Sequence, residues 1–152
     1  KFIISNSCYV GLSVSRVGGA AQTKAMKKAA GSIRIDLAQY REMEVFTQFS
    51  SDLDAATKEQ LEYGSGLMEL LKQPLGHPMS MHEMVITLCA ARNKVLLGIP
   101  VKEVKKFQMD MLNYFATVHP EISEEIEQTK ALSDELAAKI VETAKEFKDS
   151  RC

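Results

Sequence analysis

Arg16 stands where a short apolar strand pattern meets two glycines, a place suited to binding an anion. Leu12 and Val14 alternate with small residues before it, Gly18 and Gly19 follow it, and an alanine-rich stretch comes next. A guanidinium is permanently charged, and its planar N–H donors can hold two oxygens of a phosphate or a carboxylate at once. The residues alone leave two interpretations open, an anion-binding arginine or an ordinary surface cation at the end of a strand.

Asp52 and Asp54 are the other residues whose spacing suits chemistry. Two neighbouring carboxylates can act as an acid–base pair when one is protonated and the other ionised. They follow Ser50 and Ser51, however, in a polar stretch before a helical pattern, and serine and aspartate are preferred residues at a helix N-cap. We therefore expect Asp52 and Asp54 to cap a helix and not to catalyse a reaction.

The histidines and cysteines form no metal-binding or nucleophilic pattern. Cys8, Cys89 and Cys152 include no C-x-x-C pair, which argues against a disulfide framework and favours a reducing compartment. His82 and Cys89 are seven residues apart and could share a helix face, but a lone histidine on a helix is more often structural, so we expect no metal site. The sequence also lacks a phosphate-binding G-x-x-x-x-G-K-[ST] loop and a G-x-S-x-G elbow. We expect the chain by itself to be catalytically inactive.

Length and composition predict an ordinary folded domain. The chain has 152 residues, of which 45% are hydrophobic and 26% charged, enough to build a buried core. The formal net charge of −1 argues against a nucleic-acid partner, because phosphate binding requires an excess of basic side chains. No apolar run is long enough to cross a bilayer, so we expect no membrane insertion. The start at Lys1 favours a piece of a longer protein or a trimmed N-terminus.

After Gly19 the spacing of apolar residues predicts a succession of helices. Gly31 interrupts the first pattern, Pro74 ends the second, and Ser133 starts the last. The acidic stretch 121–128 predicts a short helix or a continuation of the helix before it. The expected fold is an all-α, antiparallel helical bundle of about five to six helices, preceded by a short remnant β-strand. The apolar positions expected to face the core are Ile33, Leu37, Tyr40, Met43 and Phe46; Leu61, Gly64, Met68 and Leu71; Val104, Phe107, Met111, Tyr114 and Val118; and Leu136, Ile140, Ala144 and Phe147.

The third helix has the clearest start signal. Ser80 and Glu83 have the S-x-x-E spacing of a capping box, in which each side chain accepts a hydrogen bond from the other residue's backbone N–H. Met79 and Met84 occupy the positions of a hydrophobic staple around that box. The apolar pattern then continues to residues 98–100 (GIP), where we expect the helix to end.

Several segments resemble, in the same order, the alpha subunit of the rotary ATP synthases. They are residues 10–22 (VGLSVSRVGGAAQ), 37–42 (LAQYRE), 49–57 (FSSDLDAAT), 70–73 (LLKQ) and 78–79 (PM). An ordered set of this length is far more specific than a single motif, and it covers residues 10 to about 97 strongly. The SDLDAAT turn indicates the alpha subunit, since the beta subunit has an acidic turn of the DELS type there. Residues 6–9 (NSCY) depart from the Pro-Ala-Ile-Asn type stretch of that family.

The resemblance implies that Arg16 acts in trans. In that family the matching arginine reaches into the catalytic site of the neighbouring beta subunit and acts there as an arginine finger on the γ-phosphate. A planar, permanently charged fork suits that use. Ser15, beside it, is a second candidate for a catalytic role. The resemblance also implies a tip that contacts the rotating gamma subunit, formed by Ser51, Asp52, Leu53 and Asp54.

Gln73 is the nucleotide-binding candidate that the resemblance implies. It matches a family glutamine near the adenine of the alpha subunit's own, non-catalytic nucleotide. Leu75 stands where a second glutamine is usual, and residues 74–77 (PLGH) change the loop. The cofactors implied are ATP or ADP with Mg in the assembled complex, and we expect none to bind tightly to this chain alone.

The resemblance divides the chain into residues 1–19, the end of a nucleotide-binding domain carrying the remnant strand and the arginine finger, and residues 20–152, a C-terminal helical bundle domain. The implied partners are the beta subunit, the gamma rotor subunit and the delta subunit or peripheral stalk. The implied location of this proton-transporting complex is the cytoplasmic face of a bacterial cell membrane, with an organellar inner membrane as the second choice. The alternative from another class is a freestanding helical protein-interaction module with no catalytic role.

Overall fold

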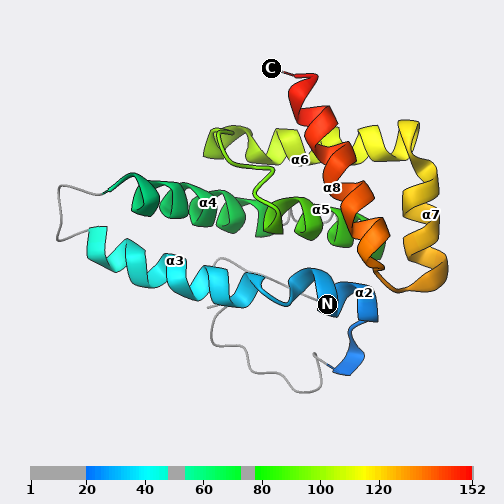
Figure 1. Ribbon diagram of the computed structural model, residues 1–152, viewed down its shortest axis with the longest axis horizontal. Helices are drawn as coiled ribbons and strands as arrows, with labels where there is room; N and C mark the ends of the chain where they lie inside the picture. Colours follow the sequence, from blue (N-terminus) through cyan, green and yellow to red (C-terminus); the bar gives the residue numbers. More distant parts are fainter. Residues whose placement is uncertain (1–19, 48–53, 73–77, 152) are drawn as a thin grey trace.

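The computed structural model describes residues 20–47, 54–72 and 78–151. No β-strand is present among these residues, and the all-α fold class is confirmed. The remnant strand expected before Arg16 lies outside the described residues. The helices, labelled as in Figure 1, are α2 (Lys24–Ala30), α3 (Ile33–Thr47), α4 (Ala55–Leu71), α5 (Met81–Arg92), α6 (Val101–Val118), α7 (Pro120–Thr129) and α8 (Asp134–Asp149).

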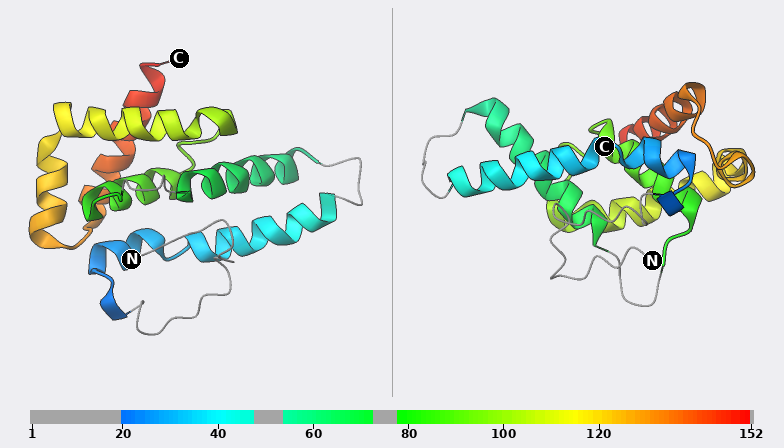
Figure 2. Two further views of the ribbon diagram at one scale, coloured as in Figure 1. Left: turned by 180° about the vertical axis from the view of Figure 1, so that it is seen from behind. Right: turned by 90° about the horizontal axis from the view of Figure 1, so that it is seen from below.

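The helices lie in three rows, with α7 closing one end. α2 and α3 form the first row, α4 and α5 the second, and α6 the third, while α8 crosses the rows on one side (Figures 1 and 2). α3 packs against α4, α2 against α5, and both α4 and α5 pack against α6. α3 and α4 run in opposite directions as a helical hairpin whose free end projects beyond the end of α6 (Figure 1). Among the described helices, α3 and α4 are the ones whose ends project beyond the others on this side (Figure 1).

The first helical pattern is divided into α2 and α3 at Gly31, as the sequence predicts. Thr23 caps α2, because its Oγ1 accepts a hydrogen bond from the Met26 N–H at 3.3 Å. Gly31 and Ser32 then form a turn, and α3 begins at Ile33. Glycine is a poor helix former because its backbone loses more conformational entropy than that of any other residue.

α4 buries a different face from the one that the spacing predicts. Of the four residues expected to face the core, Gly64 is buried, but Leu61, Met68 and Leu71 are only half-buried. The spacing rule assumes that a helix packs against the core with one narrow face. α4 instead packs against two helices, α3 and α6, so its buried face includes the sides turned toward both of them. The residues of α4 that are buried are Gly64, Gly66, Leu67 and Leu70.

α5 is the central helix of the domain. The predicted capping box is confirmed at its start: the Ser80 N–H donates to Glu83 Oε2 at 2.7 Å, and the Glu83 N–H donates to Ser80 Oγ at 3.4 Å. All residues from Val85 to Ala91 are buried, because α2, α6, α7 and α8 surround the helix. A helix that is covered on all sides needs no polar face, so its apolar residues are distributed around the helix and not confined to one stripe.

The expectation that this helix runs to residues 98–100 is wrong, because α5 ends at Arg92. The Asn93 side-chain amide donates to a carbonyl of the last turn at 2.8 Å, which satisfies one of the carbonyls that a helix end leaves open. Lys94 and Gly98 then have positive φ angles of 57° and 81°, a conformation that no helix can continue through. The connection still buries two apolar residues that prolong the helical pattern in the sequence, Val95 and Leu96.

α6 follows its predicted pattern at the start and departs from it at the end. Val104, Phe107 and Met111 are buried as expected. Tyr114 is only half-buried, and Val118 is 51% exposed at the helix end, where the chain has already turned toward α7. The core residue that the pattern missed in this turn is Phe115, which is fully buried.

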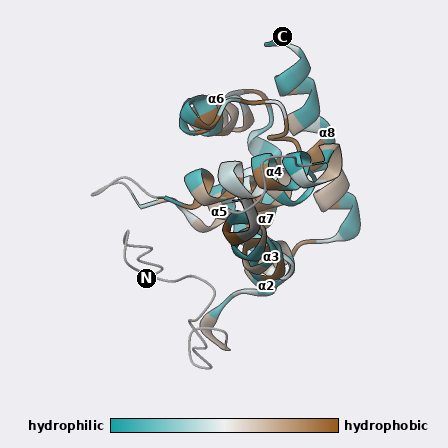
Figure 3. Ribbon diagram, turned by 90° about the vertical axis from the view of Figure 1, so that its left-hand side faces the viewer, coloured by the Kyte–Doolittle hydropathy of each residue, from teal (hydrophilic) through white to brown (hydrophobic). Residues whose placement is uncertain are grey.

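α7 and α8 confirm the sequence predictions. The acidic stretch forms α7, with Pro120 in its first turn, where a missing N–H costs nothing. Ser133 caps α8, since its Oγ accepts from the Leu136 N–H at 3.0 Å. All four residues expected on its inner face are buried, and the hydropathy colouring in Figure 3 shows hydrophilic and hydrophobic residues side by side along α8. The strong amphipathic pattern of this helix explains why the prediction succeeds.

Candidate functional site at the tip of the helical hairpin

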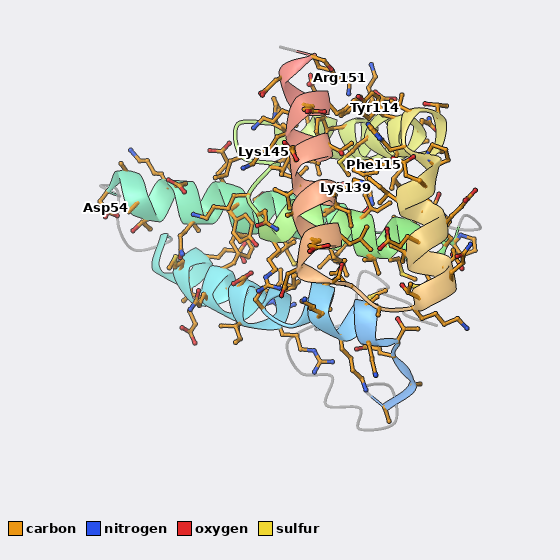
Figure 4. All side chains as sticks on the ribbon, turned by 45° about the vertical axis from the view of Figure 1, so that its right-hand side comes forward. Asp54, Tyr114, Phe115, Lys139, Lys145 and Arg151 are labelled. Carbon is orange, nitrogen blue, oxygen red and sulfur yellow. The ribbon has the colours of Figure 1, made fainter. Side chains whose placement is uncertain are left out.

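Asp54 lies at the free end of the α3–α4 hairpin, where α4 begins (Figure 4). Its Oδ1 accepts a hydrogen bond from the Thr57 N–H at 3.2 Å, and its backbone carbonyl accepts from the Lys58 N–H at 3.1 Å. Hydrogen bonds with Thr57 lower the pKa of the Asp54 carboxyl, and a negative charge here also suits the positive end of the helix dipole. The predicted N-cap role of Asp54 is confirmed.

Gly64 sets how closely the two helices of the hairpin approach. A Cβ atom built on Gly64 would lie 2.2 Å from Cδ2 of Tyr40, a distance that no real contact allows. The ring of Tyr40 therefore occupies the space that any other residue at position 64 would fill. The hairpin depends on this glycine–tyrosine contact between α3 and α4.

A hydrogen bond between Tyr63 and Asp36 joins the same two helices. The Tyr63 hydroxyl donates to Asp36 Oδ2 at 3.0 Å, and the pair is partly buried. Burial first, and the charge of Asp36 second, raise the pKa of Tyr63 above its ordinary value of 10.0. The phenol, which is protonated at neutral pH even at its ordinary pKa, remains a donor to the carboxylate.

Two glutamates on α4 connect the hairpin to the connection between α5 and α6. The Lys94 ammonium forms an ion pair with Glu59 Oε1 at 2.8 Å, and the Gly98 N–H donates to Glu62 Oε1 at 3.0 Å. The sequence patterns did not predict either of these contacts. The i, i+3 spacing places Glu59 and Glu62 on the same side of α4, and Gly98 before Ile99 indicates a turn. Neither feature of the sequence tells that these glutamates contact the connection between α5 and α6.

The base of the hairpin is held by α6. The Lys105 ammonium donates to the Leu70 carbonyl at 2.8 Å and to Gln108 Oε1 at 3.1 Å. Burial lowers the pKa of Lys105. The Gln108 amide also donates to Thr87 Oγ1 at 3.4 Å, so one polar network joins α4, α5 and α6. This network supplies a partner for the Leu70 carbonyl, one of the last carbonyls of α4 that the helix itself leaves open.

The other predicted site residues lie outside the described residues. They are Ser15, Arg16, Ser51, Asp52, Leu53 and Gln73. The structure therefore describes Asp54 of the predicted tip, together with the two helices that carry it. The arginine finger, the rotor contact and the adenine contact stay predictions.

His82 and Cys89 have separate surroundings. His82 Nδ1 lies 2.6 Å from Glu127 Oε1 and links α5 to α7, whereas Cys89 is buried, and burial raises the pKa of its thiol. Across the part of the protein that the structure describes, no three His, Cys, Asp or Glu side chains are grouped so that they could hold a metal ion. In the same part, each helix is too short or too polar to span a bilayer.

A family model identifies the class of this helical domain. The model for the C-terminal domain of the ATP synthase alpha/beta chain matches residues 22–147. The match includes every helix from α2 to α7 and most of α8. The protein described here belongs to this family of C-terminal domains of ATP synthase alpha and beta subunits.

Curated relatives identify the alpha subunit within this family. The chain is 50% identical, over 139 residues, to ATP synthase subunit alpha of Mycobacterium tuberculosis (strain H37Rv) and of Mycobacterium bovis (strain AF2122/97). It is 49% identical over the same length to subunit alpha of Mycolicibacterium smegmatis. Each match covers 91% of this chain and 25% of the relative, so the chain spans about a quarter of the length of these relatives. The resemblance to alpha subunits is confirmed.

Proposed function

We propose that this chain works as the C-terminal domain of an ATP synthase alpha subunit, in the stator head of a complex that couples proton transport to ATP synthesis and hydrolysis. The observation that carries the proposal is the 50% identity to alpha subunits over 91% of the chain. A projecting helical hairpin capped at Asp54 agrees with it. In this function the chain supports catalysis on a neighbouring subunit and does not perform it.

Arg16 is the residue of this chain that takes part in the reaction. As an arginine finger in trans, it holds oxygens of the γ-phosphate at the beta subunit's catalytic site with two N–H groups, while negative charge spreads over them in the transition state. Ser15 precedes it in the sequence and is the second catalytic candidate. Gly18 and Gly19 follow it in the sequence, and glycine permits the sharp changes of chain direction that other residues resist.

The hairpin tip is the part of this chain that contacts the gamma subunit. Ser51, Asp52 and Leu53 precede Asp54, and most of these side chains are short and polar. Short polar side chains make a sparse contact, which suits a surface that slides past a rotor. Asp54 already uses its carboxylate to cap α4, so its role is to hold the start of the helix under the tip.

The remaining partners belong to the assembled complex. They are the beta subunit and the delta subunit or peripheral stalk, in a peripheral complex at the cytoplasmic face of a bacterial membrane. ATP or ADP with Mg²⁺ is bound by that complex, where Gln73 is this protein's candidate contact to an adenine. The acidic and histidine side chains of the described residues are not grouped to hold a metal. We therefore assign no Mg²⁺ ligand to them.

A chimeric complex tests this proposal. The C-terminal quarter of the Mycolicibacterium smegmatis alpha subunit, which is 49% identical to this chain, is exchanged for it and expressed with that organism's other subunits. A photo-reactive phenylalanine analogue at position 52 reports the rotor contact, and the same analogue at position 145, an exposed site on α8, is the matched control.

The expected result is a complex that hydrolyses ATP and that cross-links to the gamma subunit from position 52 but not from position 145. Failure of the chimera to assemble, with the unexchanged subunit assembling normally, would contradict the proposal. That outcome would favour a freestanding helical interaction module. If the complex assembles and hydrolyses ATP but shows no cross-link from position 52, only the proposed contact between the hairpin tip and the gamma subunit is contradicted.

A further inference from the structure

The first half of α4 contains no buried residue, although it carries the hairpin tip. The buried residues of this helix begin at Gly64, and every residue from Ala55 to Tyr63 is exposed or half-buried. Apolar packing against the core therefore cannot by itself fix the direction of these first two turns. Polar contacts therefore contribute to fixing it.

Two polar contacts, one turn apart, join this half of the helix to the connection between α5 and α6. Glu59 pairs with the Lys94 ammonium at 2.8 Å, and Glu62 accepts from the Gly98 N–H at 3.0 Å. Both partners lie in the connection between α5 and α6, which we call the 93–98 turn. Lys94 and Gly98 both have positive φ angles, the left-handed backbone conformation. This conformation lets a short turn change direction more sharply than a helix or a strand allows.

The 93–98 turn is itself fixed to the body of the domain. The Val95 N–H donates to the Ala90 carbonyl of α5 at 3.1 Å, and the Lys148 ammonium of α8 donates to the Leu97 carbonyl at 2.5 Å. Val95 is buried, and so is Leu96. A contact with this turn is thus a contact with α5 and α8 as well.

We propose that Glu59, Glu62 and Lys94 are positioning residues that fix the direction of the α3–α4 hairpin through the 93–98 turn. The Asp36–Tyr63 hydrogen bond joins α3 to α4, so the two helices share the constraint. A displacement imposed at the tip is then passed to α5 and α8 and is not absorbed by bending of the hairpin. That a rigid hairpin transmits movement from the rotor rests on the proposed function. The rigidity itself is a property of this chain and does not depend on the rotor contact.

Electron-spin distance measurements on the 152-residue chain test the proposal. Spin labels on a keto-phenylalanine analogue, which leaves the three cysteines unmodified, replace Glu42 on α3 and Lys145 on α8, both exposed. A second label pair at Gln128 and Lys145 reports distances within the body. The test variant is Glu59→Met with Glu62→Met, and the matched control is Lys58→Met with Gln60→Met, two exposed positions on the same helix that make neither contact.

We expect the Glu42–Lys145 distance distribution to broaden in the test variant and to stay unchanged in the control, with the Gln128–Lys145 distribution constant in both. Amide hydrogen exchange in the first half of α4 should become about two- to tenfold faster, the range for losing one or two exposed polar contacts. Glu62→Gln should keep the original distribution, because its amide oxygen can still accept from Gly98. Lys94→Asn, which tolerates the left-handed backbone, should broaden the distribution partially.

Unchanged distance distributions in the double variant would overturn the proposal, whatever its melting temperature. Equal broadening in the control variant would also overturn it, because the effect would then follow from methionine substitution in general. The result is independent of the rotor contact, which is measured by the cross-link from position 52 in the complex.

Discussion

At the scale of single residues, the clearest expectation concerns the Asp54 carboxylate. Asp54→Ala should lower the melting temperature of the chain by a few degrees, because the Thr57 N–H at the start of α4 loses its partner, while Asp54→Asn, which keeps an acceptor oxygen, should lower it less. Thermal melting followed by circular dichroism measures both. Equal stability of Asp54→Ala and the unchanged protein would contradict the capping role.

The pH dependence of this effect has a definite sign. Hydrogen bonds with Thr57 hold the folded-state pKa of Asp54 below its ordinary value of 3.8. The ionised cap therefore stabilises the fold above that ordinary value, and its contribution is lost as the pH falls through the lower, folded-state pKa. The difference in melting temperature between the unchanged protein and Asp54→Ala should be constant from pH 5 upward, on the order of one unit above the ordinary value, and should shrink at more acidic pH.

Residue-level prediction from the sequence succeeds where the partner is close along the chain. The Asp54 cap and the Ser80–Glu83 box each join residues three positions apart, so local spacing contains the whole contact. The bond from the Gly98 N–H to Glu62 joins residues 36 positions apart, across a turn with left-handed backbone. No local pattern specifies that pairing, because it depends on where α5 ends and how α4 lies against it.

At the scale of helices, the two glycines of α4 offer a matched pair of substitutions. Gly64→Ala should destabilise the chain by about 1–3 kcal/mol, since its new Cβ would meet the Tyr40 ring at 2.2 Å and force the hairpin apart. Gly66→Ala, two residues further on, meets nothing within 4 Å and should be neutral or stabilising by up to about 1 kcal/mol, because alanine is the better helix former. Chemical denaturation of both variants is the measurement. If Gly64→Ala is as stable as Gly66→Ala, the close contact between α3 and α4 is wrong.

Helices with one exposed face are the ones that sequence spacing predicts well. α8 has such a face, and all four of its predicted core residues are buried. α5 is buried on every side, so the spacing of its apolar residues does not show which face meets the core. The apolar pattern also continues into Val95 and Leu96 of the following turn, which is why the helix was predicted to be too long. α4 lies between two helices, and its buried face is therefore wider than and rotated from the predicted one.

At the scale of the whole molecule, the 152-residue chain by itself should neither hydrolyse ATP nor bind it tightly. The sequence has no phosphate-binding loop, and residues 74–77 change the stretch after Gln73. Calorimetric titration with Mg-ATP measures this directly, with the complex that contains the chimeric alpha subunit as the positive control. Binding at one site with a micromolar dissociation constant would contradict the expectation.

The domain as a whole was predictable to the level of fold class and family, because many short segments agree in order with alpha subunits. Its tertiary arrangement was not, since the three rows of helices depend on contacts between distant segments, such as the Lys105 bond to the Leu70 carbonyl. The catalytic role assigned to Arg16 comes from family resemblance and not from geometry. It is therefore the claim that most needs a measurement.

Steady-state ATP hydrolysis by the chimeric complex, with Arg16 changed to alanine or lysine, tests this claim most directly. An arginine finger acts on charge that develops in the transition state, so Arg16→Ala should lower turnover by roughly 10³- to 10⁵-fold, about 4–7 kcal/mol of barrier, with little change in nucleotide affinity. Arg16→Lys should recover little of the rate, because an ammonium cannot grip two oxygens as a guanidinium does. Arg34→Ala, at an exposed arginine of α3, is the control and should leave the rate unchanged. Turnover of Arg16→Ala within about tenfold of the unchanged complex, a loss of only about 1.4 kcal/mol, would contradict the assignment and leave Arg16 an ordinary surface cation.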